Sequence, residues 1–502
     1  MRKRLAPAGM ACDNEQANLT NALAAAQESN EPTTIALGAS QTGPFAYPDG
    51  SILAGNSVTI KGVGPARPAL TGPAGSTILK SSDVSLDGVD VLAGLAPGIG
   101  LDMAFGELHD VHVKGGAVGI RAHGGMTLDG VSVAGADTGV SVQDGETVSL
   151  AHSRVSAADT GVRTRGNLTA TSTLIETTAA GARGLVGGDG NVALDHVTAV
   201  HRGPSNGQEI GLSFHPVDFG GRADLSSVVV AGYSHGIERD PSEDRANLPM
   251  TIRDSVWDDS HDLFVDVPNT GGVVQSGNVH ADPGLVDLAG GDDRLRGRSP
   301  AIDRDSQTDP RYVDIDGFAP VGAAADAGAF EYRRTPPSID EAIVPRAGGA
   351  GQVITFSAKA SDADGDDVAL AWDFGDGTTA TGAQAQHAFA AGIYTVTLRA
   401  TDEAGLSATQ SFTVGIAGAP APAKDTTAPK LSKVHLSKNH RKLLFTVSER
   451  AKVRVTVHGR TIVKTVARGR HSIRLGRVRH GVVRITATDL SGNRSAARSV
   501  RS

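Results

Sequence analysis

Short stretches in which apolar and polar residues alternate recur along the first half of the chain. The pattern V-x-L-x-x-V-x-V occupies residues 84–91, and related stretches follow at intervals of 20 to 31 residues. Such a period is typical of a solenoid, in which each repeat packs mainly against its two neighbours. The central aliphatic residues of the repeats, which we call the anchors, are Leu86, Leu108, Leu128, Leu150, Ala170, Leu194, Leu225 and Ile252.

A second part of the repeat lies 11 residues after the anchor. A glycine followed by an aliphatic residue stands there in four repeats, at Gly119, Gly139, Gly161 and Gly236. Each repeat therefore contains at least two short strands joined by a turn, with leucine and valine inside and polar residues outside. Valine, threonine and glycine dominate, whereas the L-x-x-L-x-L framework of leucine-rich repeats is missing. The pattern predicts a right-handed parallel β-helix.

The predicted β-helix extends over residues 13–333 and begins with a helix. Residues 13–26 combine an Asp-Asn cap with an Ala-rich amphipathic pattern, and a solenoid needs such a cap because its first coil exposes a strand edge. The preceding residues 1–12 have the basic start and small-residue end of an export signal but lack its apolar core. We interpret them as a residual leader, with a disordered start as the alternative.

Acidic and glycine-containing motifs end this region. They are DPGLVD at 282–287, SPAID at 299–303, DIDG at 314–317 and DAGAFEY at 326–332. The motifs resemble the closing signature of secreted bacterial β-helix proteins of the pectate-lyase-like type, and the resemblance implies an architecture rather than an activity. We expect a polar closure in which Phe330 and Tyr332 pack against the last coil. Calcium binding by Asp314 and Asp316 is the alternative role for this segment.

Residues 338–416 follow a different pattern, with several short alternating strands that predict a β-sandwich. They contain WDFGDG at 372–377, HAF at 387–389 and GIYTVTL at 392–398. These motifs closely resemble a polycystic-kidney-disease (PKD) domain. The resemblance implies a non-catalytic spacer or adhesion module of surface proteins and of secreted enzymes that degrade polysaccharides or proteins.

An acidic loop within this second segment is a candidate calcium site. Asp362, Asp364 and Asp366 alternate along a loop that carries a glycine, and oxygen ligands in this arrangement suit Ca²⁺. The loop is not an EF-hand, because no glutamate stands at its twelfth position. A solvated acidic turn is the alternative, and calcium is the only cofactor that the sequence suggests.

The last domain is predicted at residues 429–502, after a Pro/Ala linker at 417–428. From Lys430 to the end there are 19 lysines and arginines but only two acids, so this part carries +17 within a chain whose net charge is −8. Its alternating strands resemble the small immunoglobulin-like domains at the C-termini of actinobacterial surface proteins. The alternation places cationic side chains on the outside, at Lys452, Arg454, Arg484 and Arg474. The predicted fold class is thus all-β: a right-handed parallel β-helix followed by two Ig-like β-sandwich domains.

Polar residues on the outer face of the β-helix are candidates for catalysis. Outward positions on successive coils stack about 4.8 Å apart, so residues at like positions form columns. These columns contain Asp87, His109, Asp110, His112, Asp129, His152 and Arg154. Carboxylates there would hold Ca²⁺ against a uronate while an arginine or histidine removes a proton, or two aspartates would act as acid and base in glycoside hydrolysis. Polar residues that merely solvate the solenoid are the alternative.

Two aromatic residues on later coils, Tyr233 and Trp257, are candidates for stacking on a sugar ring. The motif sets of polygalacturonases and of pectate lyases are missing, so the sequence leaves open whether the protein is an enzyme.

The sequence predicts a secreted or cell-surface protein that interacts with carbohydrate or takes part in adhesion. The expected partner is an extracellular polysaccharide or an anionic cell-wall polymer, because the last domain is strongly basic. Nucleic acid is not expected, since no aromatic residues are interleaved with the cations for base stacking. No apolar run of about 18 residues occurs, so we expect no transmembrane span. We also expect a monomer. The alternative function is a polysaccharide lyase or glycoside hydrolase that acts on acidic polysaccharide.

Overall fold

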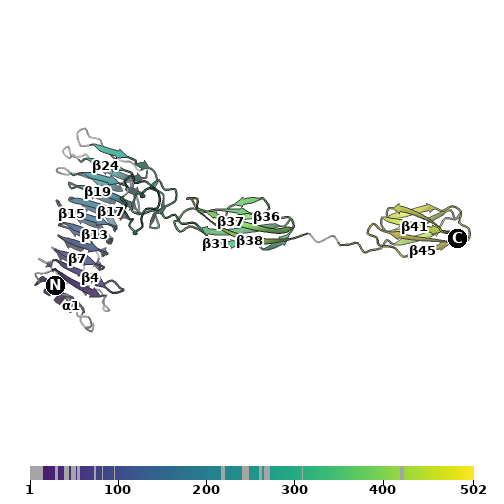
Figure 1. Cartoon of the computed structure of the whole chain (residues 1–502), viewed down its shortest axis with the longest axis horizontal. Coiled ribbons are helices and arrows are strands. Elements are labelled where there is room, and N and C mark those ends of the chain that lie inside the picture. The colour runs from purple at the N-terminus through teal and green to yellow at the C-terminus, as the bar shows by residue number, and fades with distance from the viewer. Residues whose placement is uncertain are drawn as a thin grey trace. The chain divides into compact units, whose positions relative to one another are not determined.

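In the residues that the structure describes, the protein is all-β apart from one N-terminal helix, with a β-solenoid over residues 33–280 followed by β-sandwich domains (Figure 1). This confirms the predicted fold class. The computed structural model describes residues 15–28, 32–38, 45–46, 52–53, 57–72, 75–81, 83–94, 97–215, 221–239, 248–258, 263–264, 272–307, 309–418 and 423–502. The chain forms two compact units, the second of which consists of 416–502 and two short segments of the first sandwich.

The anchors lie on the first of three columns of parallel strands, which we call the anchor sheet. Leu108 pairs in register with Leu86 on one side and with Leu128 on the other, and all three side chains are buried. The strands of this sheet are β1 (Thr33–Gly38), β4 (Val58–Val63), β7 (Val84–Asp87), β10 (Gly106–His109), β13 (Met126–Asp129), β15 (Thr147–Ala151), β17 (Asn167–Thr177), β19 (Val192–His201), β21 (Ala223–Ser226), β24 (Met250–Arg253) and β27 (Val273–Ser276).

Two further columns complete the coils. The second sheet contains β2 (Phe45–Ala46), β5 (Ala69–Thr71), β8 (Asp90–Gly94), β11 (His112–Gly115), the first parts of β14 (Ser132–Val142) and β16 (Arg154–Thr164), the later parts of β17 and β19, and β22 (Val229–Ala231), β25 (Val256–Trp257) and β28 (Val279–His280). The third sheet contains β3 (Ile52–Leu53), β6 (Thr77–Ser81), β9 (Ile99–Met103), β12 (Val118–Ala122), the ends of β14 and β16, and β18 (Arg183–Gly187), β20 (Ile210–Phe214), β23 (His235–Arg239) and β26 (Leu263–Phe264). The glycine-plus-aliphatic pairs that follow the anchors by 11 residues lie on the third sheet.

A left-handed residue turns each coil from the anchor sheet into the second sheet. The second position after the anchor has a φ between 42° and 67° in eight coils, at Gly88, Asp110, Gly130, His152, Ser172, His196, Ser227 and Asp254. A positive φ bends the chain sharply, and here it separates the outward residues of the two sheets onto different faces. The polar columns of the sequence are therefore divided between two faces and a corner.

The predicted N-terminal helix is α1 (Glu15–Gln27). Leu19, Leu23 and Ala26 are buried and belong to the same hydrophobic core as the first coils. Within the described residues, no helix has the length and apolar character needed to cross a membrane.

The closing segment, residues 282–332, packs along the side of the β-helix. Phe330 lies against Leu174, Val200 and Ala231, which come from three successive coils of the second sheet. The Gly328 N–H donates to the Ser227 carbonyl at 2.7 Å. We expected Phe330 and Tyr332 to pack against the last coil. Tyr332 does belong to a cluster with Val256 and Val279 of the last two coils, whereas Phe330 lies on earlier coils, so the segment covers the side of several coils. A hairpin of β29 (Leu285–Asp287) and β30 (Asp292–Leu295) belongs to the same segment.

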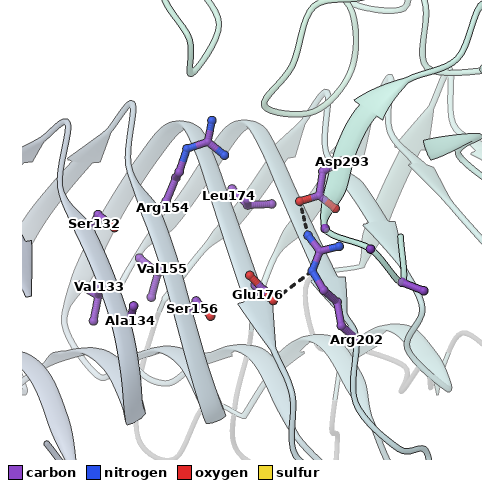
Figure 2. A pocket seen from close by; sticks show the side chains of 13 residues that line it. Ser132, Val133, Ala134, Arg154, Val155, Ser156, Leu174, Glu176, Arg202 and Asp293 are labelled. Atoms are coloured by element: carbon purple, nitrogen blue, oxygen red, sulfur yellow. Dashed lines mark hydrogen bonds and ion pairs between the residues drawn. The ribbon is translucent and has the colours of Figure 1, made fainter. Parts of the chain in front are cut away.

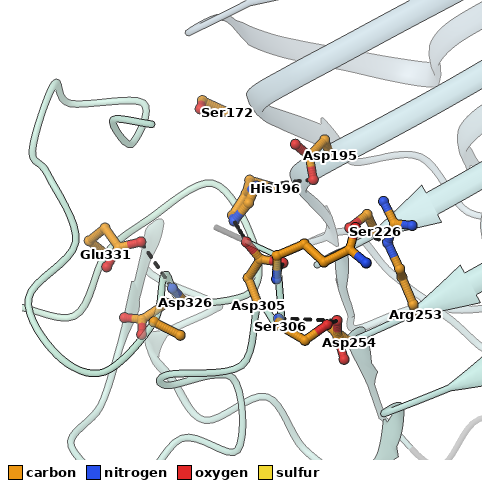
Figure 3. A network of polar contacts seen from close by, with 12 residues as sticks. Ser172, Asp195, His196, Ser226, Arg253, Asp254, Asp305, Ser306, Asp326 and Glu331 are labelled. Carbon is orange, nitrogen blue, oxygen red and sulfur yellow. Dashed lines mark hydrogen bonds and ion pairs between the residues drawn. The ribbon is translucent and has the colours of Figure 1, made fainter. Parts of the chain in front are cut away.

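Polar contacts fix the closing segment where it crosses the corner of the coils (Figure 3). His196 is buried, stacks on the Tyr312 ring at 4.0 Å between centroids, and lies 3.2 Å from Asp195 and 3.8 Å from Asp305. The Ser306 hydroxyl donates to Asp254 Oδ2 at 2.5 Å. The corner residues His196 and Asp254 thus serve as docking points for the closing segment.

The first sandwich has one sheet in the order β31 (Ser338–Ile343), β33 (Val353–Ser361) and β36 (Gln384–Ala388). The facing sheet has the order β32 (Ala347–Gly349), β38 (Ser407–Ala417), β37 (Gly392–Thr401), β34 (Ala369–Asp373) and β35 (Thr379–Thr381). Trp372 is buried beside Phe356, with 5.6 Å between the ring centroids. The tryptophan of the WDFGDG motif thus belongs to the core of this domain.

The second sandwich also has two sheets. One has the order β39 (Leu431–Leu436), β40 (Lys442–Val447) and β43 (Gly469–Arg474). The other has the order β42 (Arg460–Val466), β41 (Ala451–Val457), β44 (Val482–Thr488) and β45 (Arg498–Arg501). Alternate residues of β41, and alternate residues in the central part of β44, are buried in one core cluster. The cationic residues at the intervening positions therefore lie on the outer face.

Candidate functional site

Four of the predicted catalytic residues form one continuous row on the outer face of the β-helix. His109 lies 3.4 Å from Asp87 and 3.8 Å from Asp129, and His152 Nδ1 lies 2.9 Å from Asp129 Oδ1. We call these four residues the acid–imidazole ladder. Lys61 extends the row by pairing with Asp87, and this hydrogen bond lowers the pKa of the Asp87 carboxyl. Asp87, His109 and Asp129 are neighbours because in-register parallel coils stack like positions at strand spacing, whereas His152 reaches Asp129 from the corner of the next coil.

The other three predicted catalytic residues lie apart from the ladder. Asp110 stands at the corner and accepts a hydrogen bond from Arg67 Nη1 at 2.6 Å. His112 lies on the second sheet, 3.3 Å from Asp90. Arg154 lies two coils further along that sheet. The structure therefore does not gather the seven residues into one site.

A pocket of about 390 Å³ lies on the second sheet (Figure 2). Its floor and walls come from neighbouring strands, and the tip of the β29–β30 hairpin overhangs it. Volumes of about 300–1,000 Å³ are typical of small-molecule sites. Side chains or backbone of the following residues line it: Ser132, Val133, Ala134, Arg154, Val155, Ser156, Leu174, Glu176, Arg202, Ala289, Gly290, Gly291 and Asp293.

Arg202 holds the overhanging hairpin against the β-helix. Its Nε lies 3.0 Å from Glu176 Oε1, and another of its nitrogens contacts the Asp293 carboxylate (Figure 2). Its third nitrogen donates to the Leu288 carbonyl. Asp293 is only 4% exposed, and burial raises the pKa of its carboxyl. An arginine that is 9% exposed and meets three acceptors holds the hairpin in place over the pocket.

Arg154 is the one sequence-predicted residue in this pocket. Its Nη2 donates to Asp316 Oδ1 at 2.8 Å, and its guanidinium carbon lies 5.3 Å from the centre of the Phe330 ring. Its side chain remains 45% exposed. Sequence reasoning missed Glu176, Arg202 and Asp293 as site residues. The outward strand position of Glu176 was a signal, and Arg202 directly follows the end of β19, but only the fold brings Asp293 to them.

The two aromatic candidates lie inside the β-helix. Tyr233 is 3% exposed, and its hydroxyl bonds to Thr177 Oγ1 at 3.0 Å and to the Val200 carbonyl at 3.0 Å. Trp257 is completely buried. Their burial contradicts the expectation that these rings stack on a sugar, because neither ring presents a face to the surface.

The predicted calcium ligands in the closing segment have protein partners. Asp314 is buried and accepts hydrogen bonds from the backbone N–H groups of Asp316, Phe318 and Glu331 at 2.7–3.1 Å. Asp316 lies between the guanidinium groups of Arg154 and Arg333. These contacts organise the turn, and calcium binding at this place remains a prediction.

The acidic loop of the first sandwich is also hydrogen-bonded. Asp366 accepts bonds from the Gly297 N–H at 2.6 Å and the Tyr332 hydroxyl at 2.5 Å. Asp364 accepts bonds from the N–H and hydroxyl of Thr335 at 2.7 Å and 2.5 Å. Asp362 Oδ1 accepts a bond from the Asp364 N–H at 2.7 Å. A calcium ion there remains a prediction, and it would compete with these donors for the same oxygens.

One further group of carboxylates lies close enough to share a metal ion. In the described part of the chain, ligand atoms of Asp425, Glu449 and Asp489 lie within 4.8 Å of one another. Sequence reasoning did not single out these residues, because Asp425 comes from the linker and the other two from separate turns of the basic domain.

The cations predicted on the last domain are exposed, but they do not share one face. Lys452, Arg454 and Arg484 lie on the outer face of the four-stranded sheet, whereas Arg474 lies beside Lys442 on the other sheet. Over residues 423–502, none of the described lysines and arginines forms an ion pair with a carboxylate. Both outer faces of the sandwich therefore carry positive charge that the domain itself does not neutralise.

Comparison with known proteins identifies the first sandwich. A family model described as a PKD domain matches residues 334–416 and confirms the PKD resemblance. A microbial collagenase from Vibrio alginolyticus is 45% identical over 71 residues, which are 14% of this chain and 9% of the collagenase. The chain thus spans a small fraction of that relative.

Similarity to solved structures is weak. A carbohydrate-binding module of the β-sandwich superfamily is 16% identical, with 29% of this chain and 86% of that chain covered and a TM-score of 0.17. The SGBP-B protein of the Bacteroides ovatus mixed-linkage glucan utilization locus, bound to a heptasaccharide, is 15% identical, with 34% and 47% covered and a TM-score of 0.15. Scores this low carry no inference about this chain.

Proposed function

We propose that this protein is an extracellular or cell-surface bacterial protein that interacts with carbohydrate and holds anionic polysaccharide or cell-wall polymer through its last domain. The observation that carries the proposal is the basic surface of that domain. The domain contains 19 lysines and arginines but only two acidic residues, and cationic side chains are exposed on both sheets. The PKD domain supports an extracellular setting, because such domains are typical of extracellular bacterial proteins.

Electrostatic attraction explains how such a surface works. A field of one sign draws in polymers of the opposite sign and raises their local concentration, while salt screens it over about 10 Å at 0.1 M. The cations on two opposite faces suit a flexible polyanion that wraps around the domain better than a small ligand that needs one converging site. The PKD domain would then act as a spacer between this tether and the β-helix.

The test is binding of the full chain to immobilised polygalacturonate. We expect retention at low salt, strong weakening at about 0.3 M salt, and at least tenfold weaker binding after combined Lys452→Glu, Arg454→Glu and Arg484→Glu substitution. A matched control replaces Lys80, Lys114 and Arg163, three exposed cations of the β-helix, by glutamate. Binding that ignores salt, or that falls equally in the control, would reject the tether.

The alternative is a polysaccharide lyase or glycoside hydrolase acting on acidic polysaccharide. The acid–imidazole ladder favours it, because carboxylates and imidazoles, the usual general acids and bases, lie side by side on the outer face. The assay measures unsaturated products and new reducing ends from a panel of uronate polymers, with and without Ca²⁺. Activity that Asp129→Asn abolishes would support the enzyme, and no product from any polymer would exclude it for that panel.

A further inference from the structure

The pocket beneath the β29–β30 hairpin presents four side chains as a small grid. Arg154 and Ser156 lie two residues apart on β16, and Leu174 and Glu176 lie opposite them on β17. Strand spacing makes the grid about 4.8 Å in one direction, and the two-residue step makes it about 6.6–6.8 Å in the other. Polar groups thus occupy three corners, and the apolar Leu174 occupies the fourth.

The polar corners offer both hydrogen-bond donors and acceptors. Arg154 bonds to Asp316 through Nη2, which leaves donors on its other nitrogens. Asp316 also pairs with Arg333, so its charge is divided between two guanidinium groups. Glu176 uses Oε1 for Arg202, its side chain is 23% exposed, and the Ser156 hydroxyl lies beside it in the register.

Ion pairs hold the roof of the pocket against the β-helix. Arg202 ties the hairpin to Glu176, and Asp293 completes the cluster. Within the described residues, the buried Asp293 Oδ1 has no hydrogen-bond partner. A buried oxygen without a partner is rare in native proteins and indicates a water or a ligand donor in its surroundings.

We propose that this pocket binds a single acidic sugar unit of a polysaccharide, with the sugar carboxylate on Arg154 and a ring hydroxyl on Glu176. A planar guanidinium matches a carboxylate in shape and charge, whereas a carboxylate accepts well from hydroxyls. The inference rests on the proposed carbohydrate interaction and gives the β-helix a binding role of its own, separate from the basic tether.

The experiment titrates the full-length protein with a trigalacturonate, and with galactotriose as the neutral counterpart, by calorimetry. We expect binding of the acidic sugar, at least tenfold weaker binding of the neutral one, and at least tenfold weaker binding of trigalacturonate by Arg154→Ala. The matched control is Arg163→Ala, an exposed arginine on the same strand but outside the pocket. Ser132→Leu fills the rim beside Arg154, its in-register neighbour, while keeping the guanidinium, and is the second test if Arg154→Ala fails to fold.

The outcomes separate this inference from the proposed function. If trigalacturonate binding survives Arg154→Ala and Ser132→Leu but falls after charge reversal of Lys452, Arg454 and Arg484, the pocket inference is overturned and the tether stands. If the pocket variants lose binding while the charge-reversed protein keeps it, the pocket is supported. Equal binding of the neutral and acidic sugars overturns the role of Arg154, and no binding of either sugar overturns the pocket as a site for these ligands.

Discussion

At the scale of single residues, the least expected feature is a buried carboxyl in the closing segment. Glu331 is 3% exposed, and burial together with the nearby charge of Asp326 raises the pKa of its carboxyl to about 8 (Figure 3). Burial also raises the pKa of Asp326 to about 6. These two carboxyls thus hold protons in the folded protein that the unfolded chain releases at lower pH. Their contribution to stability is therefore greatest in acid and falls as pH rises from the ordinary carboxyl pKa of about 4 to the raised values.

We predict that Glu331→Gln makes the β-helix less sensitive to pH. Glutamine is neutral and its carbonyl can still accept the bond that the Asp326 N–H donates at 3.0 Å. At pH 9 the variant should be more stable than wild type by a few kcal/mol in the free energy of unfolding and should therefore unfold at a higher temperature. At pH 5 its stability should be close to that of wild type. Thermal unfolding at both pH values measures this, with the exposed Glu107→Gln as control. A gain of equal size at both pH values would contradict the linkage.

At the scale of the element, the left-handed corner sets the shape of every coil. Six of its eight residues are not glycine, although a positive φ costs other residues about 1–2 kcal/mol each. Some of them offset this cost by their contacts: His152 bonds to Asp129, and the Ser172 hydroxyl donates to the Val313 carbonyl at 2.8 Å. Ser227 is different, because it is completely buried and its hydroxyl has no partner among the described residues.

Ser227→Gly is therefore expected to stabilise the β-helix by about 1 kcal/mol, since glycine removes both the backbone strain and the buried hydroxyl. Ser227→Val should destabilise it, because a β-branched side chain resists a positive φ. Chemical denaturation measures both effects. The neighbouring Ser226→Gly is the matched control and should lower stability, because Ser226 lies in a regular strand and accepts a bond from Arg253.

At the scale of the whole molecule, charge is strongly segregated. Residues 1–429 contain 28 basic and 53 acidic side chains, which gives −25, whereas the remainder carries +17. We predict that the full chain binds both to anion and to cation exchangers at low salt. A chain ending at Pro429 should lose cation-exchange retention and elute later from an anion exchanger. Retention of this truncated chain on the cation exchanger would show that the basic domain does not act independently in binding.

Much of the fold was predictable from the sequence because solenoid contacts are short-range and repetitive. Leu86, Leu108 and Leu128 pair at the spacing seen in the sequence, so register, inward positions and stacked columns all followed from the repeat. The first sandwich was predictable because WDFGDG combines a core tryptophan with a tight turn. The ladder of Asp87, His109 and Asp129 was predictable for the same reason as the register.

The tertiary structure alone decided which polar columns meet and where a pocket forms. The turn at Asp110 and His152 divides the polar columns between two faces. The residue type at these positions does not reveal their positive φ. The pocket depends on Arg202 meeting Asp293, 91 residues away, and on Arg154 meeting Asp316, 162 residues away. Such contacts follow from how the closing segment lies along the side of the β-helix, which no local periodicity encodes. The sequence by itself determined the coils, and the path of the segment that covers them determined the site.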